Sequence, residues 1–345
     1  MPGNVTQRDI AEHLGISYLT VNRVLSASGK SSGKVGHATR GRILDAAQLL
    51  GYRRNIHASN LVLQRTSTIG VVWPHHALSY YQDVVSALER KARESGYQVV
   101  LTHRASPGTG SRAEVEFLLD RRVDGLIVAP DQQAEEAETF QVLAQAGTPV
   151  LLFNSFIPGI PCHYLGTDSR RGSNDLARHI LELGHRRVTF VAGPENDYTS
   201  RSRREGFLDG IRMIAGDEPG PNIVSAGGFD VEDGRRVAEE VLAMPPRPTA
   251  VIAANDALAI GLFLEFRRHG LDIPGDVSLA GYAGMWEGAL LTPPLTTVSQ
   301  PVEDLGTRAA ELIIELIGKP DRPPVFEELS DALTVRGSCA PPVTS

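Results

Sequence analysis

Residues 5–25, VTQRDIAEHLGISYLTVNRVL, decide the expected structure of the N-terminal part of the chain. Thr6 is a suitable cap for a first helix, and Asp9 stands three residues further on, where a carboxylate is stabilised by the helix N-terminus. The apolar residues of this helix recur until Gly15, a residue that is typical of a helix end. Ser17 then offers a second cap. The stretch therefore predicts two short helices joined by a tight turn.

The second predicted helix has one face for a core and another that is free to meet a partner. Helical spacing places three apolar residues together on the inner face, namely Val21, Val24 and Leu25. A third helix is expected over residues 39–50, with four residues facing inward: Ile43, Ala46, Ala47 and Leu50. Two short helices around a Gly-containing turn predict a helix-turn-helix, whose second helix enters the major groove of DNA.

The charge of the chain is distributed unevenly. Residues 1–65 contain nine Lys and Arg residues against three Asp and Glu residues, a net charge of +6. Because the whole chain carries −7, the remainder carries −13. A merely solvated basic segment is one interpretation. A basic segment on an acidic remainder also favours a DNA-binding module that is attached to a second unit.

Residues 5–11, 15–25 and 46–52 closely resemble the DNA-binding head of the LacI/GalR (lactose/galactose repressor) family. The resemblance implies that Tyr18 and Leu19 read base edges. It further implies a set of residues that contact phosphates or bases: Thr6, Ser17, Thr20, Asn22 and Arg23. The alternatives are an ordinary helix residue at Thr20 and a solvated charge at Arg23. This chain departs from the family at Asn22, where serine is common, and in a longer basic loop at 28–34.

Residues 55–67 form a short linker with helical spacing. In the family that it resembles, this linker becomes a hinge helix on DNA, and paired helices push a leucine into the minor groove. Leu61 matches that leucine, and Asn55 and Ala58 are assigned to the same DNA contact. Such a wedge unstacks a base step and bends the duplex. The alternative is that Leu61 packs against its own subunit. Arg54 replaces the proline that is usual before the hinge.

From residue 68 onward, short apolar runs alternate with helical stretches. The first series of runs lies at 69–72, 98–101, 125–128 and 150–153, and the second at 188–191, 222–224, 250–253 and 277–280. Runs that are apolar on both faces and separated by helices predict parallel sheets covered by helices. We therefore expect an α/β fold. It comprises a three-helix helix-turn-helix head at 1–54, a hinge at 55–67 and a two-lobed body at 68–345.

Landmarks such as Gly166-Thr167-Asp168, Leu183-Gly184-His185 and Ala254-Asn255-Asp256 match, in the same order, the effector domain of the same family. The fold of that domain resembles the periplasmic sugar-binding proteins. The resemblance places lobe 1 at about 68–166 and 297–325, and lobe 2 at about 167–296 and 326–340. Ligands of such sheets bind beyond the carboxyl ends of the strands. Eight residues are expected to contact the effector by their chemistry or their matching positions: Tyr80, Tyr81, Asp168, Arg203, Phe229, Asn255, Trp286 and Gln300.

Several of these residues have plainer interpretations. Asp168 suits sugar hydroxyls but also suits a helix cap. Arg203 offers a planar fork of donors, but it lies in a cluster with Arg201 and Arg204 and fits a surface ion pair as well. Phe229 suits stacking on a ligand or packing in the core.

One departure concerns the effector itself. After Gly281-Tyr282 the family usually carries an aspartate that bonds effector hydroxyls, and this chain has Ala283. Trp286, close by, is a candidate stacking platform. The identity of the effector stays open between an unusual sugar, a more apolar molecule and an anion, as do the operator sequence and the direction of control.

Other classes of protein are disfavoured by the sequence. No apolar run is long enough to cross a bilayer, and the first residues lack the pattern of a secretory signal, which disfavours an exported transport protein. Cys162 and Cys339 lack metal-ligand spacing, and His75-His76 is a poor metal pair. No nucleophile elbow or dinucleotide loop is found. We expect a cytoplasmic homodimer without enzyme activity, cofactor or metal, which binds palindromic double-stranded DNA and a small effector.

Overall fold

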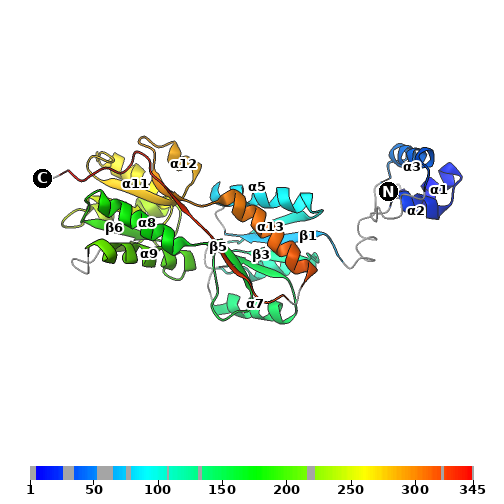
Figure 1. The fold of residues 1–345 in the computed structure, drawn as a ribbon, viewed down its shortest axis with the longest axis horizontal. Helices are drawn as coiled ribbons and strands as arrows, with labels where there is room; N and C mark the ends of the chain where they lie inside the picture. Colours follow the sequence, from blue (N-terminus) through cyan, green and yellow to red (C-terminus); the bar gives the residue numbers. More distant parts are fainter. Residues whose placement is uncertain are drawn as a thin grey trace. The chain divides into compact units, whose positions relative to one another are not determined.

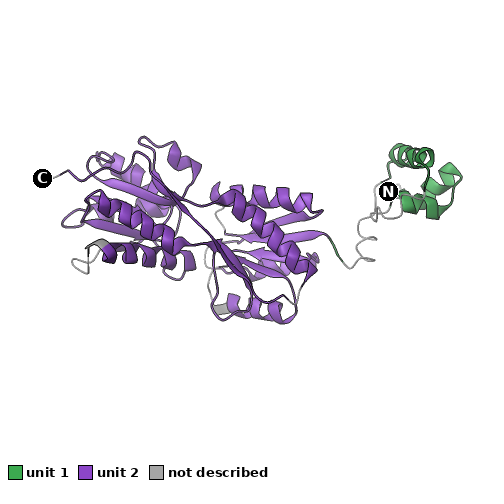
Figure 2. Ribbon diagram, in the orientation of Figure 1, with its two compact units in different colours: residues 1–66 green, residues 67–345 purple. Residues whose placement is uncertain are grey.

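The computed structural model describes residues 5–25, 35–52, 65–74, 79–106, 109–130, 134–215, 222–319 and 322–343. The chain divides into two compact units, residues 1–66 and 67–345 (Figure 2). The first unit holds the predicted head and the second holds the predicted body.

The head contains three helices, α1 (Gln7–Leu14), α2 (Tyr18–Leu25) and α3 (His37–Leu49). α1 begins with a capping box between Thr6 and Asp9 and ends at Gly15, whose φ of 63° lies in the left-handed region. The helices enclose a small core of Ile10, Ala11, Val21, Ile43, Ala46 and Ala47. The predicted three-helix head is confirmed, although α3 begins two residues earlier than expected.

Lobe 1 of the body is built on a parallel sheet in the strand order β11-β5-β4-β3-β1-β2. The strands are β1 (Thr68–Trp73), β2 (Gln98–His103), β3 (Gly125–Val128), β4 (Val150–Phe153), β5 (His163–Thr167) and β11 (Phe326–Leu329). Its helices are α5 (Ser79–Glu94), α6 (Arg112–Asp120), α7 (Ala134–Gln145) and α13 (Val302–Gly318).

Lobe 2 is built on a second six-stranded sheet in the order β12-β10-β9-β8-β6-β7. The strands are β6 (Val188–Ala192), β7 (Asn222–Ser225), β8 (Ala250–Ala253), β9 (Ser278–Ala283), β10 (Thr296–Ser299) and β12 (Ala332–Thr334), and only β12 is antiparallel to its neighbour. Its helices are α8 (Ser169–Glu182), α9 (Tyr198–Ala215), α10 (Val231–Leu242), α11 (Asp256–Arg268) and α12 (Trp286–Ala289). The predicted parallel sheets are confirmed.

The chain passes between the lobes three times: from β5 to α8, from β10 to α13, and from β11 to β12 (Figure 1). The first passage matches the boundary predicted at residue 166. The other two lie a few residues later than predicted, because β10 pairs within lobe 2 and β11 pairs with β5 in lobe 1. The boundaries expected at about 297 and about 326 thus fall at the starts of these two strands.

Glycines let the covering helices approach closely. A side chain at Gly306 of α13 would lie 2.3 Å from the carbonyl oxygen of Val84 in α5. A side chain at Gly206 of α9 would lie 2.0 Å from the carbonyl oxygen of Arg170 in α8. The α5–α13 pair covers one face of the lobe 1 sheet, and α8 and α9 lie side by side in lobe 2 (Figure 1). Among the described residues, no helix is long and apolar enough to span a membrane.

Candidate functional site

The second helix of the head exposes the residues that were expected to read DNA. Tyr18 and Leu19 are large side chains, yet they are 45% and 63% exposed, while Val21 on the opposite side is fully buried. Arg23 is also exposed, and Asn22 is half-buried. An exposed aromatic and an exposed leucine have no role in the head's own core. This face of α2 is therefore available to a partner of the head.

The hydroxyl groups near the helix starts are already engaged within the head. The Ser17 Oγ accepts a hydrogen bond from the Thr20 backbone N–H at 3.2 Å and lies 3.0 Å from the Thr20 Oγ1. Thr6 donates its backbone N–H to Asp9 at 2.7 Å, and this bond is the main reason that the pKa of Asp9 is lowered. The Ser17–Thr20 contacts fix the start of α2, and the Thr6–Asp9 bond fixes the start of α1. Asn55, Ala58 and Leu61 lie outside the described residues.

In the body, Arg203 of α9 lies at the carboxyl ends of the lobe 2 strands. It is only 5% exposed. Its Nη1 donates to the Ala254 carbonyl at 2.7 Å, its Nη2 donates to the Gln300 Oε1 at 3.4 Å, and its guanidinium stacks 3.9 Å from the centre of the Tyr282 ring. Arg203 forms no ion pair with any described residue, and its buried Nε has no hydrogen-bond partner. The surface ion pair is therefore not what the structure shows.

The three passages between the lobes meet beside Arg203. Gln300, on the second passage, donates its Nε2 to the Thr167 Oγ1 of the first passage at 2.7 Å. Asp331, on the third passage, accepts a hydrogen bond from the Tyr282 hydroxyl. The other oxygen of Asp331, Oδ1, is buried and has no hydrogen-bond partner among the described residues. Loss of solvation raises the pKa of Asp331 to about 6.

Asp331 is a residue that the sequence analysis missed. Its position depends on the turn between β11 and β12, and β11 was not predicted. No motif marks it, since Asp331 is separated from Tyr282 by about fifty residues. The structure thus adds a carboxyl group close to the edge of the sheet where the family aspartate is absent.

Lobe 1 contributes an aromatic wall at the carboxyl ends of β1 and β4. Tyr80 is 6% exposed, and its hydroxyl accepts a 2.6 Å hydrogen bond from the Asn154 Nδ2. Tyr81 packs on Trp73 with ring centres 5.4 Å apart, and burial raises its pKa to about 12. Both tyrosines lie near Arg203, whose charge acts on each of them. The structure therefore brings Tyr80, Tyr81, Arg203 and Gln300 together.

Two of the predicted effector residues act as helix caps. The Asp168 Oδ1 accepts a 3.1 Å bond from the Arg171 backbone N–H at the start of α8. The Asn255 Oδ1 accepts from the Leu258 N–H at 2.8 Å, and its Nδ2 donates to the Phe229 carbonyl at 2.9 Å. The cap is thus the observed role of Asp168. In Asn255, both polar atoms already serve the fold.

The remaining predicted residues differ in exposure. Phe229 is half-buried against the lobe 2 core, whereas Trp286 is 57% exposed at the start of α12. Ala283 is buried and has a φ of 115°, a strained value for a residue other than glycine. The nearby carboxylate of Asp256 is fully used, since it accepts from the Met285 N–H at 2.7 Å and the Thr297 Oγ1 at 2.6 Å.

Side chains also tie the two lobes together across the aromatic wall. Ser79 at the start of α5 donates to the Glu287 carboxylate of α12 at 2.7 Å. Thr199 at the start of α9 donates to the Asn154 carbonyl at 2.9 Å. These two bonds make the relative position of the lobes sensitive to anything that competes for the same groups.

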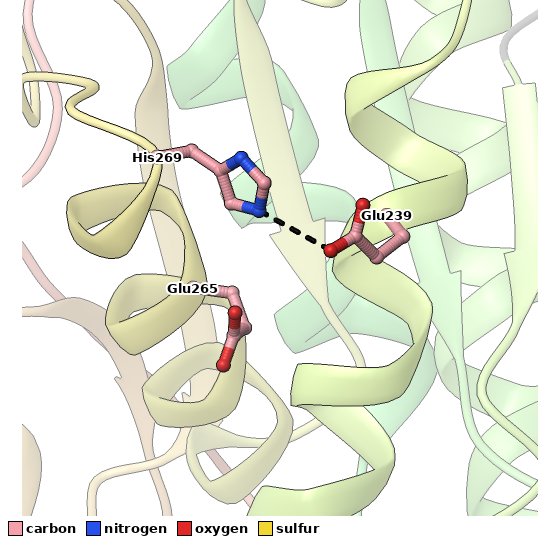
Figure 3. Close-up of side chains that lie close together, drawn as sticks. All are labelled: Glu239, Glu265 and His269. Carbon is pink, nitrogen blue, oxygen red and sulfur yellow. Dashed lines mark hydrogen bonds and ion pairs between the residues drawn. The ribbon is translucent and has the colours of Figure 1, made fainter.

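One group of possible metal ligands lies on α10 and α11, away from these residues. Glu239, Glu265 and His269 bring their donor atoms within 4.8 Å of one another (Figure 3). However, Arg235 and Arg268 each donate to the Glu265 carboxylate, and Arg268 and His269 both lie within 3.3 Å of Glu239. The carboxylates are thus neutralised by arginines, and the group is explained as an ion-pair network.

Comparisons with known proteins find relatives of both the head and the body. Residues 6–55 match the family model for bacterial regulatory proteins of the lacI family, and residues 177–339 match a periplasmic binding protein-like domain. The ribose operon repressor of Escherichia coli (strain K12) is 28% identical over 334 residues, which cover 96% of this chain and 99% of that protein.

Two solved structures are similar over almost the whole chain. A lac repressor dimer bound to operator and the anti-inducer ONPF is 26% identical, with a TM-score of 0.84, and the match covers 98% of this chain and 100% of that one. A complex of the transcriptional regulator CelR with cellobiose is 27% identical, with a TM-score of 0.70, and covers 97% and 100%.

A helix-turn-helix head with an exposed recognition helix, attached to a two-lobed α/β body, defines a DNA-binding transcription regulator that responds to a small molecule. The relatives are themselves named as repressors or transcriptional regulators. The chain belongs to the LacI/GalR family of bacterial transcriptional regulators.

Proposed function

We propose that this regulator is a homodimeric repressor and that a small polyhydroxylated molecule, a sugar or a sugar-containing metabolite, controls its affinity for a palindromic operator. The ligand binds between the lobes against Tyr80, Tyr81, Arg203 and Gln300. The family relationship supports the repressor and dimer assignments, because the similar lac repressor structure is a dimer on operator. Sugar chemistry is supported by the similar regulator that holds cellobiose.

The observation that carries the proposal is the state of Arg203. A guanidinium that is 95% buried, stacked on Tyr282 and left with an unpartnered Nε is costly unless it serves a ligand. Asp331, which accepts from the hydroxyl of the same tyrosine, adds a second acceptor through its unpartnered Oδ1. A hydroxylated ligand supplies both an acceptor for Arg203 and a donor for Asp331. Phe229 offers an apolar face nearby.

A thermal-shift screen of the full-length chain tests the site. We expect at least one compound among ribose, cellobiose, cytidine and related sugars to raise the melting temperature of the body, since a ligand stabilises the state that it binds. Arg203→Ala should weaken the binding of that ligand by on the order of 2 kcal/mol, which is about a thirtyfold increase in its dissociation constant. The matched control is Arg178→Ala, an exposed arginine of α8 that pairs only with Glu182 in the structure.

Equal affinity in the wild type and Arg203→Ala would show that the site is misplaced. A loss of affinity in Arg178→Ala as well would indicate a general charge effect. The melting temperature of each variant without ligand shows whether it is folded.

A further inference from the structure

The three neighbouring arginines of α9, Arg201, Arg203 and Arg204, lie in two different environments. Arg203 contacts Gln300 and Tyr282, whereas Arg201 and Arg204 line a separate pocket at the carboxyl ends of β6 and β7. Ser200, one turn before Arg204, also lines it, as do Gly193 and Ser225. The pocket offers about 360 Å³, including the part that is open to solvent. None of the polar side chains assigned to the cleft lines it.

The polar groups of this pocket are mostly donors. Ser200 is only 2% exposed, and its hydroxyl makes no hydrogen bond to any described residue. Arg204 is half-buried and has no carboxylate partner in the described part of the chain. Arg201 donates one nitrogen to the Asn196 carbonyl at 3.2 Å. Glu195 is the one acidic residue of the lining, so the lining carries a net positive charge.

The backbone contributes less than the arginines do. The pocket lies at the N-terminal turn of α9, a helix of 18 residues, but the Asp197 carboxylate already meets part of the positive charge of that helix end. The Asp197 side chain already accepts from the Ser200 N–H at 2.7 Å, so the helix start is capped without using the serine hydroxyl. Two guanidinium groups and a free hydroxyl suit an anion with several acceptor oxygens in a tetrahedral arrangement.

We propose that this pocket binds phosphate, either as the inorganic ion or as the phosphate group of a small metabolite. The site is distinct from the effector cleft but borders it. A side chain at Gly193 would lie 2.3 Å from the Phe229 ring, so the pocket and the aromatic face of the cleft share one thin wall. Phosphate in the pocket can therefore shift the Phe229 ring and so change the affinity of the proposed effector site for its ligand.

Titration of the full-length wild type with inorganic phosphate and with glucose 6-phosphate, followed by calorimetry at constant ionic strength, tests the proposal. We expect saturable binding of at least one probe. Tighter binding of the sugar phosphate indicates a metabolite, and equal or tighter binding of the inorganic ion indicates phosphate itself. Arg204→Ala should weaken binding roughly tenfold. Glu195→Gln should strengthen it, because it removes the carboxylate of the lining.

The matched control is Arg212→Ala, which removes the same charge from an exposed position two turns along α9. It should bind the probes as the wild type does. The proposal is overturned if neither probe binds at roughly millimolar concentration, or if Arg204→Ala and Arg212→Ala have equal effects. A chain that binds phosphate but no operator would contradict the proposed regulatory function alone.

Discussion

At the scale of single residues, Asp331 makes a testable contribution to stability. Its pKa rises from an ordinary value of 3.8 to about 6 in the folded protein, mainly through loss of solvation. Arg203 opposes this rise, whereas Asp168 favours it. Between pH 4 and 6 the folded state therefore binds more protons than the unfolded state. It follows that the contribution of Asp331 to stability is largest in acid and is lost as the pH rises through this window.

We expect Asp331→Asn to remove this dependence. The difference in free energy of unfolding between the wild type and the variant should fall by on the order of 1–2 kcal/mol from pH 4 to pH 7 and then level off. Both tryptophans of the chain, Trp73 and Trp286, lie in the body, so tryptophan fluorescence follows the body alone. A difference that stays constant across this range would contradict the environment assigned to Asp331.

The sequence predicted which types of side chain gather at the proposed site, but it did not predict which hydrogen bonds each side chain makes. Arg203 and the two tyrosines were predicted because their types and positions fit a ligand site, and the structure brings them close together. Asp168 and Asn255 were harder, because a carboxylate or amide that precedes a helix serves equally well as a cap, and only the structure shows the bond that is made. Asp331 needed the topology of the third passage.

At the scale of elements, the close contact between α5 and α13 leaves no room for a side chain at position 306. Gly306→Ala would place a methyl group 2.3 Å from the Val84 carbonyl oxygen and 2.7 Å from the Ala87 Cβ. Backbone must move to relieve this overlap, so we expect a loss of about 1–3 kcal/mol in stability. Gly318→Ala, at the end of the same helix, meets nothing within 4 Å and should be neutral or slightly stabilising.

Thermal melting followed by tryptophan fluorescence compares the two variants. If Gly306→Ala melts at the wild-type temperature, the close helix contact is not present in solution.

Elements themselves were well predicted where their pattern was strong. Buried runs such as Ile69–Val72 and Ala250–Ala253 became central strands, and the head followed from its caps and spacing. β11, with the sequence FEEL, alternates between exposed and half-buried residues at the edge of its sheet. Such a short polar strand has no periodic signal, and pairing with β5 alone defines it.

At the scale of the whole molecule, the proposed regulation requires that the ligand and the operator each bind one conformation of the protein more tightly than another. A ligand changes operator affinity only if it prefers one arrangement of the lobes. The bonds from Ser79 to Glu287 and from Thr199 to the Asn154 carbonyl join the lobes at the edges of the proposed site. We expect a ligand that rearranges these bonds to alter the relative position of the lobes, and we expect the proposed dimer to transmit that change to its heads.

The most direct test measures operator affinity with and without the ligand found in the thermal screen. The operator is a palindromic duplex selected from random DNA, and fluorescence anisotropy reports binding. We expect the ligand to change operator affinity by roughly 5- to 150-fold in the wild type, and by far less in Arg203→Ala at the same concentration. Arg23→Ala should weaken operator binding while preserving the ratio. The account is contradicted if a ligand stabilises the body and leaves operator affinity unchanged, or if no duplex is preferred.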